Sequence, residues 1–374
     1  MKRCVLLLIA LLLIGRPIAP AFGQADALNL PTDLYVLLNA GVVQRFGLGA
    51  SGIVNITPPD TFVIDFAISP DDSQIAYRTE EGLVIADMSA GLPVMGSVVD
   101  TLGDIPPIRG RGQTMAWSPQ GDTIAYTSLS GVRVYYPDSG DVVLINQTPL
   151  VGVGWSADGR HLVAEANNNI WWIYRHAGTQ FVLRAAIPSS MGTVWIDNSR
   201  LVFAPEAGGL LTMDLDSGNA QTALLDDNAA YRLPTLAPDG RLLFFRRFQD
   251  SDSVPEGYGE LVALSPGSPR LDVLGATPID LSGGLQWAPG AEFMIAFQGG
   301  VLALFDPATG QGFPLPVGSA VAYSWGMYPP APAPGDATPE AIFPDAFPTL
   351  DPLTALPGVV TVTPVPAVEE TPEA

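Results

Sequence analysis

Apolar residues along this chain occur in short runs, separated by turns rich in glycine, aspartate, serine and proline. Within many runs apolar and polar positions alternate, as in GVRVYY at 131–136 and GLLTMD at 209–214. A period of two is typical of β-strands, whereas an amphipathic helix needs apolar residues three or four apart over ten or more positions. After the first few residues no stretch has that helical spacing. The pattern therefore predicts an all-β chain.

One hairpin sequence recurs along the chain. Residues 117–126 read WSPQGDTIAY and residues 155–164 read WSADGRHLVA. Each copy is followed by a second pair of strands that ends at an Asp/Gly turn, so a unit holds four strands. The first positions of the copies, spaced by 38 to 51 residues, are Ile68, Trp117, Trp155, Trp195, Leu236, Trp287 and Trp325. Four short strands in about forty residues are typical of a β-propeller blade.

The two ends of the pattern predict how the ring closes. The last copy, Val321–Gly326, has no strands after it, because a proline-rich segment begins at Pro329. Near the N-terminus, Leu34–Leu38 and Val42–Phe46 resemble the third and fourth strands of a unit that lacks its first half. We therefore expect seven four-stranded blades, the closing one composed of both chain ends. Six blades are the alternative, if the terminal strands pair less completely.

These hairpins resemble the repeat of the periplasmic TolB-type propellers, which are related in architecture to WD repeats. The resemblance is carried by WSPQG at 117–121, by WSADG at 155–159, and by the IAY-type strands and the Asp/Gly turns that follow them. It covers about residues 34–326 and implies a propeller, but it says little about function because one fold hosts many functions. TolB also has an α/β domain before its propeller, and we expect none here.

The N-terminus predicts a signal peptide over residues 1–25. Lys2 and Arg3 precede a short apolar run, Cys4–Gly15, and small residues follow as far as Ala25. Twelve apolar residues rise only about 18 Å as a helix, against a hydrocarbon core of about 30 Å. We therefore expect export to the periplasm or the medium, with no transmembrane anchor after cleavage. Residues 26–328 would form the propeller.

The chain is strongly acidic. The chain has 17 basic and 38 acidic residues, and removal of the predicted leader leaves 14 arginines and a net charge of −24. Such a protein repels phosphate backbones, so we expect no nucleic-acid partner. Residues 329–374 carry acids and many prolines but no base, which predicts a disordered tail. We expect a monomer.

Candidate catalytic chemistry is sparse. Cys4 is the only cysteine and belongs to the leader, and the two histidines are predicted to be a partly exposed strand residue, His161, and a turn residue, His176. Two histidines cannot form a three-histidine metal site, so we expect no metal and no cofactor. Gly47–Gly52 matches G-x-G-x-x-G but precedes strand-like sequence, which predicts a turn. Asp214–Gly218 lacks the last acid of a calcium loop and predicts a capped turn.

Two intervals between copies are about ten residues longer than a typical blade. The excess lies in Thr101–Gly112 and Arg246–Gly259, two types of connection that open on the same face of a propeller, the top face. Loops on a rigid scaffold often carry binding residues, although exposed arginines are also common without any function. The candidate ligand-binding residues are Arg109, Arg111, Arg232, Arg246 and Arg247.

Taken together, these features favour an exported, non-enzymatic binding or assembly module that holds a protein segment or an anionic ligand at the top face. The alternative is an extracytoplasmic carbohydrate-active enzyme, a lyase or hydrolase, that uses carboxylates at the channel mouth. Candidates for such carboxylates are Asp100, Asp104 and Asp280. A third possibility is a purely structural domain of a cell-surface protein.

Overall fold

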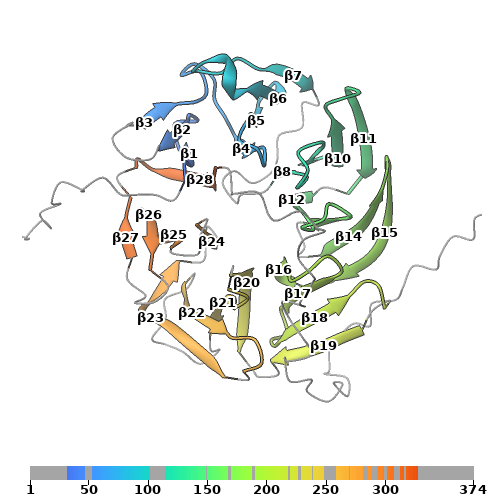
Figure 1. The fold of residues 1–374 in the computed structure, drawn as a ribbon, viewed down its shortest axis with the longest axis vertical. Helices are drawn as coiled ribbons and strands as arrows, with labels where there is room; N and C mark the ends of the chain where they lie inside the picture. The colour runs from blue at the N-terminus through green and yellow to red at the C-terminus, as the bar shows by residue number, and fades with distance from the viewer. Residues whose placement is uncertain are drawn as a thin grey trace, which may run out of the picture.

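The chain forms a ring of seven four-stranded antiparallel sheets around a central axis (Figure 1). This computed structural model describes residues 32–46, 53–101, 114–148, 150–166, 170–187, 190–217, 220–225, 229–237, 239–247, 258–268, 270–280, 285–288, 293–298, 301–306, 312–315 and 317–326. The predicted seven-bladed propeller is confirmed, and the six-bladed alternative is wrong. Within the described ranges, no helix combines the length and the hydropathy that crossing a bilayer requires.

Blades 1 to 6 follow chain order, each with its first strand nearest the axis (Figure 1). Blade 1 contains β4 (Asp65–Ile68), β5 (Gln74–Thr79), β6 (Gly82–Asp87), the 3-10 turn η2 (Met88–Ala90) and β7 (Ser97–Asp100). Blade 2 contains β8 (Met115–Trp117), β9 (Ile124–Ser128), β10 (Gly131–Tyr136) and β11 (Asp141–Asn146). Blade 3 contains β12 (Leu150–Trp155), β13 (His161–Ala166), β14 (Trp171–Ala177) and β15 (Gln180–Ile187).

The remaining three consecutive blades repeat this layout. Blade 4 contains β16 (Ser190–Trp195), β17 (Arg200–Pro205), β18 (Leu210–Asp214) and β19 (Ala220–Leu225). Blade 5 contains β20 (Ala230–Leu236), β21 (Leu242–Arg247), β22 (Tyr258–Leu264) and β23 (Leu271–Asp280). Blade 6 contains β24 (Leu285–Trp287), β25 (Met294–Gln298), β26 (Val301–Phe305) and β27 (Gly312–Pro314).

The closing blade joins the two ends of the ring, as predicted. Its order is β28 (Ala320–Trp325), β1 (Leu34–Leu38), β2 (Val43–Phe46) and β3 (Ile53–Asn55). The expectation that β1 and β2 are third and fourth strands is wrong, because they are second and third. The C-terminal side supplies a single strand, so the N-terminal side must supply three. Residues 47–52, predicted as a turn, lie outside the described residues, but a strand rather than a helix comes directly after them.

The hydrophobic core lies between neighbouring blades. Each of its seven clusters combines side chains of two adjacent sheets; for example, Ala76 and Leu83 of blade 1 pack with Trp117 and Ile124 of blade 2. Since successive side chains of a strand point to opposite faces, a central strand must be apolar on both faces to pack against both neighbours. This explains why strands such as β9 are buried along their whole length. The ring therefore depends on every blade for its stability.

The recurrent hairpin ties adjacent blades together. Two tryptophans at the first position of the repeated hairpin donate through Nε1 to backbone carbonyls of the preceding blade: Trp117 to Ala67 at 3.3 Å and Trp155 to Ala116 at 3.0 Å. Trp117 lies in the core between blades 1 and 2, and Trp155 packs against the core between blades 2 and 3.

Candidate functional site

Both long connections leave the same face of the ring. In every blade the fourth strand ends beside the turn between the second and third strands; in blade 1, Asp100 at the end of β7 lies opposite Leu83 at the start of β6. We call this end of the sheets the top face and the end with the first hairpins the bottom face. The β7–β8 and β21–β22 connections both begin and end at the top face. Arg109 and Arg111 lie outside the described residues.

Arg246 and Arg247 do not begin the loop, as the sequence suggested, but form the last two positions of strand β21. The Arg246 guanidinium binds the carboxylate of Glu260 on β22, with Nη2 2.9 Å and Nε 3.2 Å from Oε2. Its side chain is only 15% exposed. Arg246 is therefore held against its own sheet by a carboxylate, and a ligand would have to approach this pair rather than a solvated arginine.

Arg232 lies within strand β20, and it is exposed. It stands opposite Phe245, whereas Arg246 stands opposite Tyr231. Residues directly opposite each other share a face of the sheet, and adjacent positions alternate. Phe245 packs toward blade 6 and Tyr231 toward blade 4, so Arg232 and Arg246 project from opposite faces of the same sheet. The structure thus brings these two arginines to one end of blade 5 but not to one surface.

Sequence reasoning missed a buried polar group at the top of blades 1 and 2. Asp65, 1% exposed, pairs in register with Arg78, 2% exposed. The Asp65 carboxylate accepts hydrogen bonds from the backbone N–H of Phe66 at 2.9 Å and from the N–H and hydroxyl of Thr114. Burial raises the pKa of Asp65, although these hydrogen bonds and the charge of Arg78 oppose the shift. The sequence feature that could have revealed this group is the single charged residue in each of two largely apolar core strands, β4 and β5.

The same group continues into blade 2. Arg78 donates from Nη1 to the carbonyl of Thr127, and its guanidinium carbon lies 5.7 Å from the centre of the Tyr126 ring. The Tyr126 hydroxyl donates in turn to the carboxylate of Asp100. Burial raises the pKa of Tyr126, so this hydroxyl stays protonated. Because Asp100 and Thr114 flank the β7–β8 connection, the network holds both ends of that connection on the blades.

The three carboxylates proposed for catalysis do not form a described pair. Asp100 is engaged by Tyr126, Asp104 lies outside the described residues, and for Asp280 only the backbone, at the end of β23, is described. Among the side chains that the structure describes, no group of three His, Cys, Asp or Glu is placed as a metal site would need. Asp214 caps its turn, as predicted, by accepting from the N–H groups of Asp216 and Ser217.

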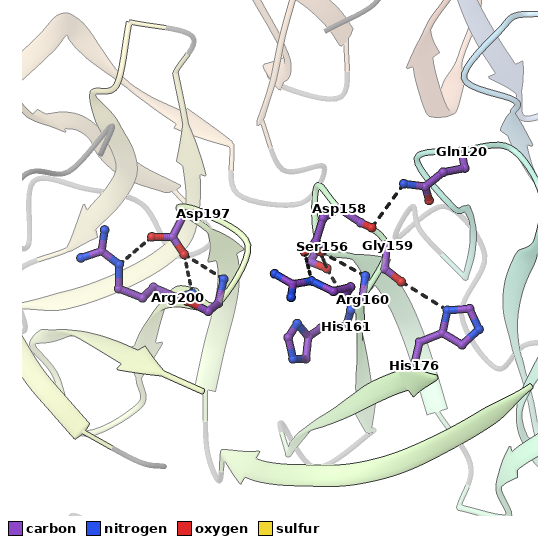
Figure 2. Close-up of polar contacts among 10 residues, drawn as sticks. Gln120, Ser156, Asp158, Gly159, Arg160, His161, His176, Asp197 and Arg200 are labelled. Carbon is purple, nitrogen blue, oxygen red and sulfur yellow. Dashed lines mark hydrogen bonds and ion pairs between the residues drawn. The ribbon is translucent and has the colours of Figure 1, made fainter. Parts of the chain in front are cut away.

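Both histidines lie in blade 3 near the bottom face (Figure 2). The prediction that His161 is partly exposed is wrong: it is 5% exposed and stacks on Trp195, with ring centres 5.5 Å apart. Burial lowers the pKa of His161. His176 is not in a turn but near the end of β14, where it stacks on Phe181 at 4.6 Å. The two rings pack as aromatic residues and not as a catalytic pair.

Comparisons with solved structures agree with this architecture. A protein of unknown function from Desulfotomaculum acetoxidans is similar over 80% of this chain and 100% of its own, with a TM-score of 0.58 and 12% identity. An oligogalacturonate lyase in complex with manganese is similar over 76% of this chain and 84% of its own, with a TM-score of 0.51 and 12% identity. The shared feature is the fold. TolB from Acinetobacter baumannii is similar over 80% of this chain and 67% of its own, with a TM-score of 0.49 and 12% identity.

At such identities the comparisons show a propeller and nothing about a ligand. Neither a protein-family model nor the sequence of a curated protein matches the chain.

Proposed function

We propose that this chain is an exported, non-enzymatic binding module whose top face engages a protein segment or another anionic ligand. The observation that carries the proposal is that two enlarged connections, in blades three places apart, start from the same face of one rigid ring. The sequence places Arg109 and Arg111 in one of them, and Arg246 and Arg247 directly before the other. Loops on a rigid scaffold are where binding residues concentrate.

An anionic partner fits these residues for an electrostatic reason. A net charge of −24 on the expected mature chain repels anions over most of the surface, so a ligand carboxylate needs local guanidinium groups to bind. Arginine binds carboxylates through paired, charge-assisted hydrogen bonds. Arg246 already holds Glu260 in this way, so the ligand would extend or replace that contact. Arg232, Arg109, Arg111 and Arg247 would supply the additional charge.

The test is a comparison of top-face variants in a pull-down from the extracytoplasmic fraction. Arg247→Ala should reduce the yield of a bound partner while leaving the melting temperature unchanged. The matched control is Arg184→Ala, which removes the same charge from an exposed position of the outer strand β15. A partner retained equally by both variants would contradict a top-face site. Arg246→Ala is a weaker test, because it also leaves Glu260 without its ion pair.

Export is the second part of the proposal. Residues 1–25 have the composition of a signal peptide, and the first strand begins at Leu34, so cleavage would leave the ring intact. The secreted protein should begin near Gln24 or Asp26 by N-terminal sequencing. Extracellular material that begins at Met1 would show that the leader assignment is wrong.

A further inference from the structure

A row of arginines lies on the bottom face, in the turns that join the first and second strands. Three consecutive blades each place one aspartate and one arginine in this turn: Asp158 with Arg160, Asp197 with Arg200, and Asp239 with Arg241. The arginine Nε meets the aspartate Oδ2 in every pair, at 2.6 Å in the second and third. Figure 2 shows the first two pairs on neighbouring hairpins. We call these turns of blades 3 to 5 the arginine arc.

Two arginines of the arc, Arg160 and Arg241, can accept a second carboxylate. Contact through Nε uses one edge of the guanidinium, and the Nη groups carry further donors that suit a carboxylate. The side chain of Arg160 is 58% exposed, so its outer edge is open to solvent. Each arginine also balances the charge of its own aspartate, so the arc repels an acidic segment less than turns without arginine do, although Asp216 adds a carboxylate near Arg160.

The corresponding turns of blades 1 and 2 are acidic. Blade 1 carries Asp71 and Asp72, and blade 2 carries Asp122, with no arginine or lysine in either turn. Asp71 is held by the hydroxyls of Ser69 and Ser73, which do not neutralise it. An acidic segment at the bottom face is therefore repelled by blades 1 and 2 and tolerated by blades 3 to 5.

The chain leaves the ring at this same rim. In blades 1 to 6 the residue after the first position of the repeated hairpin donates its backbone N–H to a carbonyl near the start of the second strand. Ala237, for example, donates to the carbonyl of Arg241 at 2.7 Å. In the closing blade Gly326 donates in the same way to Asp33, at 2.7 Å. Residues 327 onward therefore start where the other blades have their first turn. Blades 3 and 4 lie on the opposite side of the seven-membered ring (Figure 1).

The segment after Gly326 supplies carboxylates that the arginine donors of the arc can bind. Residues 327–374 contain no base and seven acids: Asp336, Glu340, Asp345, Asp351, Glu369, Glu370 and Glu373. Asp336 is ten positions after Gly326, and a proline-rich segment extends about 3 Å per residue. That gives a reach of about 30 Å, on the order of the diameter of a small domain. The carboxylate of Asp72 lies beside Gly326, so the acids of the segment, from Asp336 onward, are repelled from the near side of the rim.

We propose that the acidic segment 336–351 of this chain docks across the bottom face on Arg160 and Arg241. The segment starts on the bottom face, is long enough to reach the arc and carries the carboxylates that arginines bind. The acids of blades 1 and 2 repel it from their side of the bottom face. Covalent tethering makes the contact intramolecular, so individually weak ion pairs suffice to hold it. The bottom face is then covered by the chain itself, and a ligand of the top face does not compete with the segment.

The test uses zero-length cross-linking of the full chain. Lys2, in the predicted leader, is the only lysine, so a carbodiimide has no other side-chain amine to join to a carboxylate. Arg160→Lys and Arg241→Lys each introduce one amine into the arc without changing the charge. The control is Arg184→Lys, on the exposed outer strand β15. The turn aspartates, Asp158 and Asp239, should react in the arc variants and so report that the amine is reactive.

We expect both arc variants to yield peptides cross-linked to Asp336, Glu340, Asp345 or Asp351, and the control to yield none. These cross-links should disappear in about 1 M salt, where the Debye length falls to about 3 Å. The proposal is overturned if only the turn aspartate reacts, or if R184K links to the tail equally. A mixture of ¹⁴N- and ¹⁵N-labelled chains must give links within one chain; links between chains would also overturn it. Independently, R160Q/R241Q should increase the hydrodynamic radius of the protein.

Discussion

Arg78 offers the sharpest test of the buried polar network at the top of blades 1 and 2. Replacing it with methionine keeps an unbranched side chain of similar length and removes the charge. The change eliminates the hydrogen bond to the Thr127 carbonyl, the contact with the Tyr126 ring and the favourable field on Asp65. Because Asp65 is 1% exposed, water cannot replace the lost cation.

The expected loss of stability comes from these contacts. A hydrogen bond to a charged group contributes about 1.5–3 kcal/mol, and a desolvated cation–π contact about 2 kcal/mol. Removal of Arg78 also takes away the charge that favours ionised Asp65, and leaving a buried charge uncompensated costs about 3–5 kcal/mol in total. We therefore expect Arg78→Met to lower the free energy of unfolding by about 3–5 kcal/mol. Arg184→Met, at an exposed site, should change it by less than about 0.5 kcal/mol.

The loss should depend on pH with a defined sign. A carboxyl whose folded pKa is raised contributes stability below its unfolded pKa and loses that contribution as pH rises through the folded pKa. Burial already raises the pKa of Asp65, and removal of Arg78 raises it further. R78M should therefore be less destabilised at acidic pH than at neutral pH. Adding Asp65→Asn to R78M should restore part of the lost stability, because the amide carries no charge.

Urea unfolding followed by tryptophan fluorescence measures all four proteins, and an unchanged m-value shows that the folded and unfolded states remain comparable. A loss below about 1 kcal/mol for R78M would refute the reasoning, since it would place Arg78 in contact with solvent. So would a D65N/R78M protein less stable than R78M, which would show that the charge of Asp65 is stabilising without its cation.

Two further predictions concern blades 2 and 3. Burial lowers the pKa of His161, so its contribution to stability is complete above the unfolded pKa of about 6.5 and is lost as the pH falls through the folded pKa. His161→Phe should therefore flatten the acid side of the curve of unfolding free energy against pH. An unchanged curve would show that His161 is solvated. At Gly131, φ is +130° and an added Cβ would lie 1.7 Å from the carbonyl oxygen of Asn146, so Gly131→Ala should cost more than about 2 kcal/mol in the same assay. Gly140→Ala is the control, since Gly140 also has a positive φ, +75°, but an added Cβ there would meet no atom within 4 Å. An equal cost in both variants would assign the effect to backbone conformation alone.

Local patterns were enough to predict the repeating hairpin, the four-stranded unit and the ring of seven. Each blade is formed by neighbours in sequence, and the turn residues and strand alternation that define it are all local. The assignment of the terminal strands failed because β3 has only three residues and comes after a glycine-rich stretch. Its place depends on pairing with β2, and a short strand has too few residues for its pattern to show.

The candidate site could be predicted only in part, because the environment of a charged residue depends on residues distant in sequence. Arg246 was recognised as a top-face residue, but its ion pair with Glu260 depends on the register of β21 against β22. In the same way, His161 is buried because blade 4 places Trp195 over it.

Residue types and their spacing along one chain are sufficient for the fold class, the number of blades, the position of the two long connections and the strongly acidic charge. Which charges are buried and which are paired becomes apparent only in the folded ring, where Asp65 and Arg78 meet Thr114 and Thr127 of the next blade. The physical reason is that burial and pairing are set by packing between blades. The residues in contact there, such as Arg78 and Thr127, are 49 positions apart, and no local pattern records their contact.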